Sequence, residues 1–138
     1  MSTKIEGDAK QRLVAAAREA AGRSYSPYSH FRVGAALLCE DGSIISGTNV
    51  ENRSFGLTNC AERSAIFTAV GAGKHRFRAA AVCGLDAGSP LPPCGACRQV
   101  LTEFCDPTMP VLMSDRKTTI EKTLGDLLPY DSLHEIRG

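Results

Sequence analysis

Three of the six cysteines are spaced so that their thiolates could bind one metal ion. Cys94 and Cys97 stand three residues apart after two prolines, on one side of the first turn of an expected helix. Cys60 occupies the equivalent place at the start of the preceding expected helix. Free backbone N–H groups and the dipole at a helix start favour the thiolate form of cysteine. Because a sulfur-rich tetrahedral site selects zinc, the spacing predicts a zinc site.

Glu62 adds an acidic group to this predicted zinc site. It follows Cys60 by two positions on the same first turn, so its carboxylate can face the ion without binding it. Three protein ligands leave one coordination position of zinc open for water, which is typical of catalytic sites. Zinc lowers the pKa of that water toward about 7, and a nearby carboxylate can carry its proton. The combination predicts a hydrolytic site.

Two arginines follow these residues directly. Three thiolates around Zn²⁺ leave a surplus negative charge, which weakens the Lewis acidity of the ion. Arg63 follows Glu62 and Arg98 follows Cys97, so each expected helix brings one guanidinium close to the sulfurs. We expect both arginines to donate hydrogen bonds to the thiolates and to offset the surplus charge. The alternative for each is a solvated helix position.

Two other interpretations of the cysteines stay open. The Cys-x-x-Cys pair alone would suit a thioredoxin-like redox site, which leaves the third cysteine and the glutamate unexplained. A structural zinc site would need a fourth cysteine. Cys39 and Cys83 fall in or beside apolar strands, where small hydrophobic packing explains them better. Cys105 lies about 16 Å along its helix from Cys94, which is too far to join it.

The hydrophobic pattern indicates the elements that must position these residues. Helices are expected at 8–22, 60–70 and 94–104, with a last short helix near 124–128. Strands are expected at 31–38, 44–50, 79–85 and 111–113. Residues 24–29 form a loop, and the Asp41-Gly42 pair predicts a hairpin between the first two strands. Strands joined through helices indicate a mixed sheet in an α/β layered domain.

Composition and charge exclude several classes of protein. The 138 residues, 43% hydrophobic and 22% charged, are typical of a single globular domain spanning 1–138. The 16 Lys and Arg against 15 Asp and Glu give a net charge of +1, which does not favour a polyanion partner. The N-terminus is polar and no apolar run approaches the ~18 residues of a membrane span. We expect a cytoplasmic protein without a membrane partner, in which cysteines serve metal chemistry rather than disulfides.

Four segments of the sequence share a pattern with a known family. They read Phe31-Arg32-Val33-Gly34-Ala35-Ala36-Leu37, Asn49-Val50-Glu51-Asn52, Asn59-Cys60-Ala61-Glu62-Arg63 and Pro93-Cys94-Gly95-Ala96-Cys97-Arg98-Gln99-Val100. The last two of these segments together contain the three-cysteine version of the zinc nucleoside deaminase signature. In order and spacing, from about residue 26 to residue 129, the sequence resembles the small homotetrameric cytidine deaminases.

The resemblance implies a fold and a reaction. The fold is a three-layer α/β/α sandwich around a mixed five-stranded sheet, and the assembly is a homotetramer. The reaction is hydrolytic deamination of cytidine and deoxycytidine to uridine and deoxyuridine, with release of ammonia, in pyrimidine salvage. By this resemblance Cys60, Cys94 and Cys97 hold one Zn²⁺ per chain. A zinc-activated hydroxide attacks C4 of the cytosine ring, and Glu62 carries protons to the ring nitrogen and the leaving ammonia.

The resemblance also assigns residues to the substrate. Asn49 and Glu51 match positions that hold the ribose hydroxyls, and a short polar pair on one face at a strand end suits that role. Phe31 and Ala61 match positions that line the nucleoside pocket. Phe55 replaces a frequent tyrosine in a segment that contributes to a neighbouring subunit's site.

Two departures from the family concern the substrate range. Arg53 stands where a small residue is usual, which adds a charge at the pocket rim or a subunit contact. The tail Leu127-Leu128-Pro129-Tyr130-Asp131-Ser132-Leu133 replaces a common Pro-Gly-Ala-Phe, whose Phe reaches a partner's site. Either Tyr130 or Leu133 supplies this apolar contact, or the pocket is more open.

Other functions are weighed against this one. A deaminase of a modified or antibiotic aminopyrimidine nucleoside would use the same zinc and glutamate, although Asn49 and Glu51 favour an unmodified sugar. A nucleic-acid deaminase needs an open channel with basic and aromatic platforms, whereas this chain has 6% aromatic residues and one basic run at 74–78. A non-catalytic zinc-stabilised binding module would explain the cysteines but not Glu62.

Overall fold

A five-stranded mixed sheet forms the middle layer of the protein. The structure is a computed structural model that describes residues 6–130. The strand order is β2-β1-β3-β4-β5. The strands are β1 (Val33–Cys39), β2 (Ile44–Thr48), β3 (Phe77–Gly84), β4 (Pro110–Ser114) and β5 (Thr119–Thr123). Only β3 and β4 pair in parallel, and the other neighbours are antiparallel.

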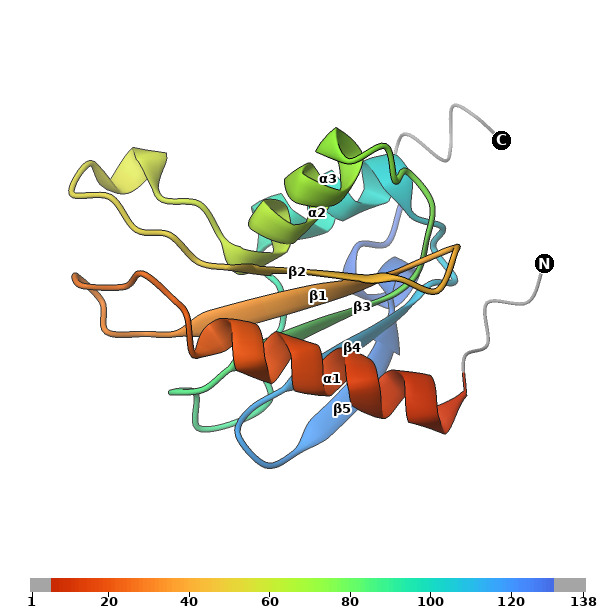
Figure 1. Ribbon diagram of the computed structural model, residues 1–138, viewed down its shortest axis with the longest axis horizontal. Coiled ribbons are helices and arrows are strands. Elements are labelled where there is room, and N and C mark those ends of the chain that lie inside the picture. The colour runs from red at the N-terminus through yellow and green to blue at the C-terminus, as the bar shows by residue number, and fades with distance from the viewer. Residues whose placement is uncertain (1–5, 131–138) are drawn as a thin grey trace.

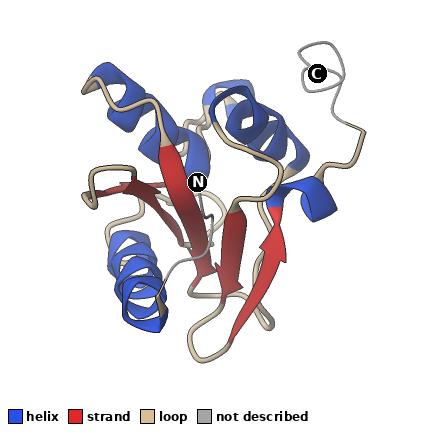
Figure 2. Ribbon diagram, turned by 90° about the vertical axis from the view of Figure 1, so that its right-hand side faces the viewer, coloured by secondary structure: helices blue, strands red, loops and turns tan. Residues whose placement is uncertain are grey.

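Helices cover both faces of this sheet. The helix α1 (Gly7–Ala21) packs on one face, and α2 (Ala61–Gly71) and α3 (Gly95–Phe104) pack on the other (Figures 1 and 2). A short 3₁₀ helix, η1 (Phe55–Leu57), precedes α2, and α4 (Leu124–Leu127) follows β5. The expected three-layer α/β/α sandwich is therefore confirmed. No helix within the described range has the length and apolar character needed to cross a bilayer.

The central strand β1 has apolar side chains on both of its faces. Ala36 and Leu38 belong to the core under α1, whereas Ala35 and Leu37 belong to the core under α2 and α3. Side chains alternate between the two faces of a strand, so a strand covered twice must be apolar throughout. This explains the unbroken run of apolar residues in the sequence.

The sequence pattern found most of these elements but missed one strand. The three long helices, the hairpin and four strands lie where they were expected, within a few residues at the ends. The strand β5 was not expected from the hydrophobic pattern. It lies at the edge of the sheet, and four of its five residues are exposed and include Glu121 and Lys122. An exposed edge strand needs no apolar run, so the pattern carries no signal for it.

The register of the strands brings the two important helix starts to one end of the sheet. Gly34 pairs with Thr48 at the end of β2, and Val33 pairs with Gly84 at the end of β3. The chain leaves β2 toward α2 and leaves β3 toward α3. Both helices therefore start at this end, together with the loops 22–32 and 49–60 that project beyond it (Figure 1).

Gly47 lets α2 approach the sheet closely. A Cβ atom at this position in β2 would lie 2.5 Å from Ala65 N and 2.9 Å from Ala61 O, both backbone atoms of α2. Backbone atoms cannot move without moving the helix, so only glycine permits the observed position of α2. The first turn of α2 carries Cys60 and Glu62, and Gly47 therefore sets how far these residues stand from the sheet.

Replacing Gly47 is expected to destabilise the protein. Gly47→Ala should reduce the free energy of unfolding by about 3 kcal/mol, because overpacking of this kind forces the backbone apart. Urea denaturation would measure the change. Gly71→Ala is the matched control at the other end of α2, where a new Cβ would meet no atom within 4 Å. An unchanged stability of Gly47→Ala would show that α2 adjusts freely.

Candidate active site

The three predicted thiols meet where α2 and α3 begin. Cys60 and Cys94 are the N-cap residues of these helices, and Cys97 lies in the first turn of α3. Their Sγ atoms all lie within 4.8 Å of one another. Cys60 Sγ is 3.8 Å from Cys94 Sγ, which is 3.3 Å from Cys97 Sγ and accepts a hydrogen bond from Cys97 N at 3.4 Å.

This donor set fits a zinc ion. Tetrahedral zinc with Zn–S bonds of about 2.3 Å places neighbouring sulfurs about 3.8 Å apart, close to the spacing between Cys60 and Cys94. Within residues 6–130, no other cluster of three or more His, Cys, Asp or Glu side chains could hold a metal ion. Cys39, Cys83 and Cys105 are buried free thiols elsewhere in the core, so the described chain offers no fourth cysteine. The site therefore has the open composition expected of a catalytic zinc.

Without an ion, the thiols share protons unequally. Hydrogen bonds from Cys97 and Arg63 lower the pKa of Cys60 to about 5. The pKa of Cys97 is raised, because Cys97 donates to Cys60 and is buried. Cys60 is thus a thiolate at neutral pH while its neighbour keeps a proton. Metal binding to this cluster must release that proton.

Arg63 contacts one of the thiolates, as the sequence predicted. Its Nη2 donates to Cys60 Sγ at 3.2 Å, and the thiolate raises the pKa of the guanidinium. Residues three apart on a helix start are neighbours, which explains the contact. The Arg63 Nε atom is buried and has no hydrogen-bond partner among the described residues. The guanidinium thus retains one donor beside the sulfurs.

The expectation for Arg98 is wrong. Its Nε donates to Pro93 O and its Nη1 donates to Leu127 O, both at 2.8 Å, instead of to a thiolate. The reason is competition from better acceptors. Leu127 ends α4, and the last carbonyls of a helix lack donors within that helix. Arg98 therefore joins the residue before Cys94 to the last helix of the described chain.

Glu62 is held in an apolar environment in the first turn of α2. It borders a small internal space with Ala35, Val82 and Leu101. Burial, assisted by the negative charge of Cys60, raises the pKa of Glu62 to about 7. A carboxyl group with this pKa exists in both ionisation states near neutral pH, as a group that accepts and returns a proton requires.

Asn49 is bound to the start of β1. Its Oδ1 accepts from Val33 N at 3.0 Å and from Ser24 Oγ, and its Nδ2 donates to Phe31 O at 2.9 Å. These contacts fix the orientation of the amide, because one end faces donors and the other faces an acceptor. Within the described residues, one N–H of Nδ2 has no partner. Sequence reasoning placed Ser24 only in a loop and did not predict this contact.

Glu51 is bound to the loop before β1. Its Oε1 accepts from Tyr28 N and Ser29 N, each at 3.1 Å, and its Oε2 accepts from the Ser29 hydroxyl. These hydrogen bonds lower the pKa of Glu51, the Ser29 hydroxyl having the largest effect. Residue types alone indicated only a loop here, so Ser29 was missed. Its position four residues before the start of β1 is the one feature of the sequence that could have indicated it.

A cavity of ≈ 330 Å³ opens beside Glu51, lined also by Tyr28, Ser29, Phe55 and Thr58. The ring of Phe55 meets that of Tyr28 edge to face, with centroids 6.3 Å apart, yet Phe55 remains 77% exposed.

Three further predicted substrate residues lie at the same end of the sheet, whereas Tyr130 does not, because β5 leads the chain to the opposite end. Phe31 is half-buried before β1, Ala61 is buried in the first turn of α2, and Arg53 is exposed in the loop after β2. Tyr130 is exposed at the end of the described chain. Leu133 lies outside the described residues.

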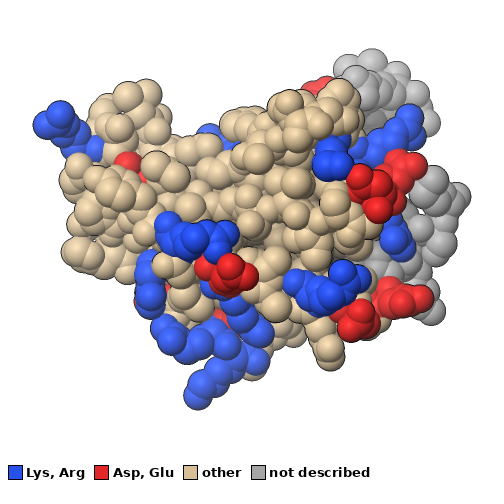
Figure 3. Space-filling view, in the orientation of Figure 1, with Lys and Arg blue, Asp and Glu red and all other residues tan. Residues whose placement is uncertain are grey.

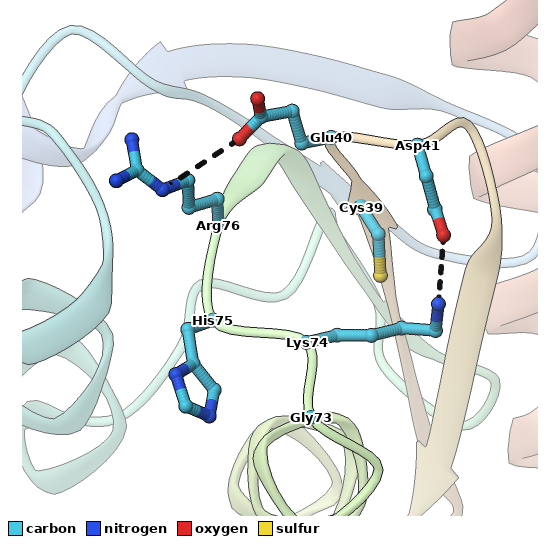
Figure 4. A pocket seen from close by; sticks show the side chains of 7 residues that line it. All are labelled: Cys39, Glu40, Asp41, Gly73, Lys74, His75 and Arg76. Atoms are coloured by element: carbon cyan, nitrogen blue, oxygen red, sulfur yellow. Dashed lines mark hydrogen bonds and ion pairs between the residues drawn. The ribbon is translucent and has the colours of Figure 1, made fainter.

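A second cavity lies at the opposite end of the sheet and lacks these features. It measures ≈ 370 Å³ and is formed by the β1–β2 turn and the loop after α2 (Figure 4). Its charges are paired: Lys74 Nζ lies 2.7 Å from Asp41, and Arg76 Nε lies 3.9 Å from Glu40. No cluster of metal ligands borders it in the described chain. The thiol end is therefore the candidate active site.

Comparison with known proteins indicates that this chain binds zinc. The family model described as "Cytidine and deoxycytidylate deaminase zinc-binding region" matches residues 8–113. A cytidine deaminase of Sporosarcina psychrophila is 50% identical over 120 residues, covering 86% of this chain and 88% of that protein. One of Halalkalibacterium halodurans is 48% identical over 121 residues, covering 87% and 91%.

A solved structure shows the same likeness in three dimensions. The crystal structure of cytidine deaminase from Burkholderia pseudomallei superposes with a TM-score of 0.83 at 46% identity. The likeness covers 87% of this chain and 96% of that one.

The three-thiol site makes a prediction about metal content. Cys94→Ala should bind less than one zinc per chain, because only two thiols remain. Cys105→Ala should keep one zinc per chain, because Cys105 lies in the core outside the cluster. Metal analysis of the purified variants after dialysis would measure both. Loss of zinc from Cys105→Ala, with the fold intact by circular dichroism, would contradict the three-ligand site.

Proposed function

Because the chain belongs to the family of zinc-binding cytidine and deoxycytidylate deaminases, we propose that it hydrolyses cytidine and deoxycytidine to uridine and deoxyuridine with release of ammonia. One observation carries the proposal. The carboxyl group of Glu62 is buried in the helix turn that follows Cys60, with a pKa near 7. A purely structural zinc site has no need of such a group.

The chain's own thiols would hold the metal. Cys60, Cys94 and Cys97 fit zinc by their spacing and chemistry. When bound there, zinc supplies a Lewis acid that brings the pKa of a water molecule down toward about 7. The Arg63 guanidinium offsets the surplus negative charge of three thiolates through its hydrogen bond to Cys60 Sγ.

Glu62 would move the protons of the reaction. The oxygen of one water molecule bonds to C4 of the cytosine ring, and the bond from C4 to the amino nitrogen breaks. Of the two water protons, one remains on the ring nitrogen and the other leaves with ammonia. A single carboxyl group that accepts and returns each proton in turn satisfies this balance.

Asn49 and Glu51 would recognise the sugar. In the described chain Asn49 Nδ2 keeps one free N–H, and Glu51 Oε2 keeps one free position of the about four that a carboxylate offers. The free N–H can donate to a sugar hydroxyl group, and the free carboxylate position can accept from one. This supports a nucleoside, rather than a free base, as the substrate.

The setting of the enzyme is part of the proposal. A cytoplasmic location suits a site that needs reduced thiols, and all six cysteines are free. A role in pyrimidine salvage suits the proposed reaction on nucleosides. A homotetramer suits the exposed apolar side chains around α2 and the preceding loop, which are Val50, Phe55, Leu57 and Phe67. In Figure 3, which has the orientation of Figure 1, the surface over α2 and the loop before it shows mostly uncharged residues. Exposed apolar groups gathered in this way favour contact with another subunit.

The substrate panel is the experiment that tests this function. Protein carrying one zinc per chain should release ammonia from cytidine and deoxycytidine, and not from cytosine or a cytosine-containing oligonucleotide. Glu62→Gln should keep its zinc and its fold and lose roughly 10²–10⁴-fold in kcat, because the proton carrier is gone. Absence of ammonia from all four substrates with zinc bound would overturn the function. Full activity of Glu62→Gln would overturn only the role of Glu62.

Arg63→Gln tests the charge argument separately. The neutral amide should lower kcat by about ten-fold in the zinc-loaded enzyme, because the thiolate charge is no longer offset. The free energy of unfolding should fall by less than about 1.5 kcal/mol, the usual value of one hydrogen bond. Arg12→Gln is the matched control, since Arg12 pairs only with Asp8 on the exposed side of α1. An unchanged kcat in zinc-bound Arg63→Gln would show that the argument is wrong.

A further inference from the structure

The hydroxyl group of Ser29 belongs to a chain of hydrogen bonds that joins Glu51 to Asn49, the two residues proposed to recognise the sugar. It donates to Glu51 Oε2 and accepts from Phe31 N at 3.0 Å. Phe31 O in turn accepts from Asn49 Nδ2 at 2.9 Å. The chain of contacts therefore runs from Glu51 through Ser29 and Phe31 to Asn49.

The turn that contains Ser29 has an unusual backbone. His30 has a φ of 58°, in the left-handed region that residues with a side chain rarely adopt. Such a conformation persists only where its surroundings hold it, and it often occurs at functional sites. Here His30 N donates to Ser26 O at 3.0 Å, and Glu51 Oε1 receives the amides of Tyr28 and Ser29. Together with the bond from Phe31 N to the Ser29 hydroxyl, these contacts hold the turn. The hydroxyl proton itself is directed to Glu51 Oε2, and this donation gives Ser29 a second role.

That role follows from the acceptor positions of Glu51. The two amides occupy Oε1, and the Ser29 hydroxyl occupies one position on Oε2. Of the about four positions of a carboxylate, one remains, on Oε2. Because Ser29 and Glu51 line the same ≈ 330 Å³ cavity, the contact between them fixes where this last position points.

We propose that Ser29 is a positioning residue for sugar recognition: its hydroxyl orients Glu51 so that one acceptor position on Oε2 meets a sugar hydroxyl. The inference rests on the proposed function and adds a determinant of specificity to it. Within residues 6–130 the Ser29 hydroxyl bonds to Glu51 and Phe31, and neither to the thiols nor to Glu62. Its effect must therefore appear in nucleoside binding and depend on the sugar hydroxyl.

The experiment compares two nucleosides in wild type and Ser29→Ala. The kcat and KM for deoxycytidine are measured, together with the inhibition constant of 2′,3′-dideoxycytidine, which lacks the hydroxyl. In Ser29→Ala the KM for deoxycytidine should rise roughly ten-fold, as for one hydrogen bond to a charged group. The kcat for deoxycytidine and the inhibition constant of the dideoxy compound should stay within about two-fold, since those values are independent of the hydroxyl contact.

Four further variants keep the test specific. Ser29→Thr retains a hydroxyl and should restore the KM. Ser43→Ala removes the same kind of contact at the opposite end of the sheet, where the Ser43 hydroxyl donates to the Asp41 carboxylate at 2.6 Å. This variant should change neither the KM for deoxycytidine nor the inhibition constant of the dideoxy compound. In a Glu51→Gln background, Ser29→Ala should have no further effect, because the carboxylate through which it acts is absent. If Ser29→Ala does not fold, Ser29→Cys keeps the side-chain size with a weaker donor and should raise the KM by a smaller factor.

Two results would overturn the proposal. One is an unchanged KM for deoxycytidine in folded Ser29→Ala or Ser29→Cys. The other is an equal loss for the deoxy and dideoxy compounds, which would indicate a general disturbance of the loop. Failure of the proposed function is seen separately, because the wild-type enzyme would then release no ammonia from deoxycytidine.

Discussion

Bringing three sulfur atoms from two helices within 4.8 Å of one another is the constraint on which the rest of the structure depends. Two N-cap positions can meet only if both helices start at the same end of the same sheet. Because β2 and β3 both pair antiparallel with β1, they run in the same direction, and the helices that follow them start at the same end. Gly47 then brings α2 close enough to the sheet for Cys60 to reach its partners. The fold thus holds the three thiols together and leaves one coordination position without a protein ligand.

Local patterns in the sequence predicted the cluster because its members stand at helix starts, where spacing determines which side chains share a face. The same reasoning placed Arg63 beside a thiolate. It failed for Arg98, because the competing carbonyl at Leu127 comes from an element 29 residues away in the chain. The strand β5 was missed for a related reason. An edge strand is defined by its neighbour in the sheet and leaves no periodic trace of burial in its own residues.

The polar residues of the pocket show a third limit of sequence reasoning. Asn49 and Glu51 were assigned to the sugar, yet each also fastens the loop before β1 through backbone amides or carbonyls. Such double use cannot be recognised from residue types, since amide and carboxylate groups satisfy either role. It does explain how a loop with a left-handed His30 keeps one shape. The cavity beside Glu51 and the loop before β1 are therefore parts of one hydrogen-bonded unit.

The contacts of Arg98 make the two termini of the chain unequal as attachment points. One guanidinium binds the carbonyl of Pro93, directly before a ligand, and the carbonyl of Leu127 at the end of α4. A load applied to the C-terminus, such as a fusion partner or a tether to a solid support, would thus pull on the metal loop. The helix α1 lies on the opposite face of the sheet (Figure 2). For immobilising or tagging this enzyme, attachment ahead of α1 places the load on the face of the sheet opposite α2 and α3, whose first turns carry the thiols.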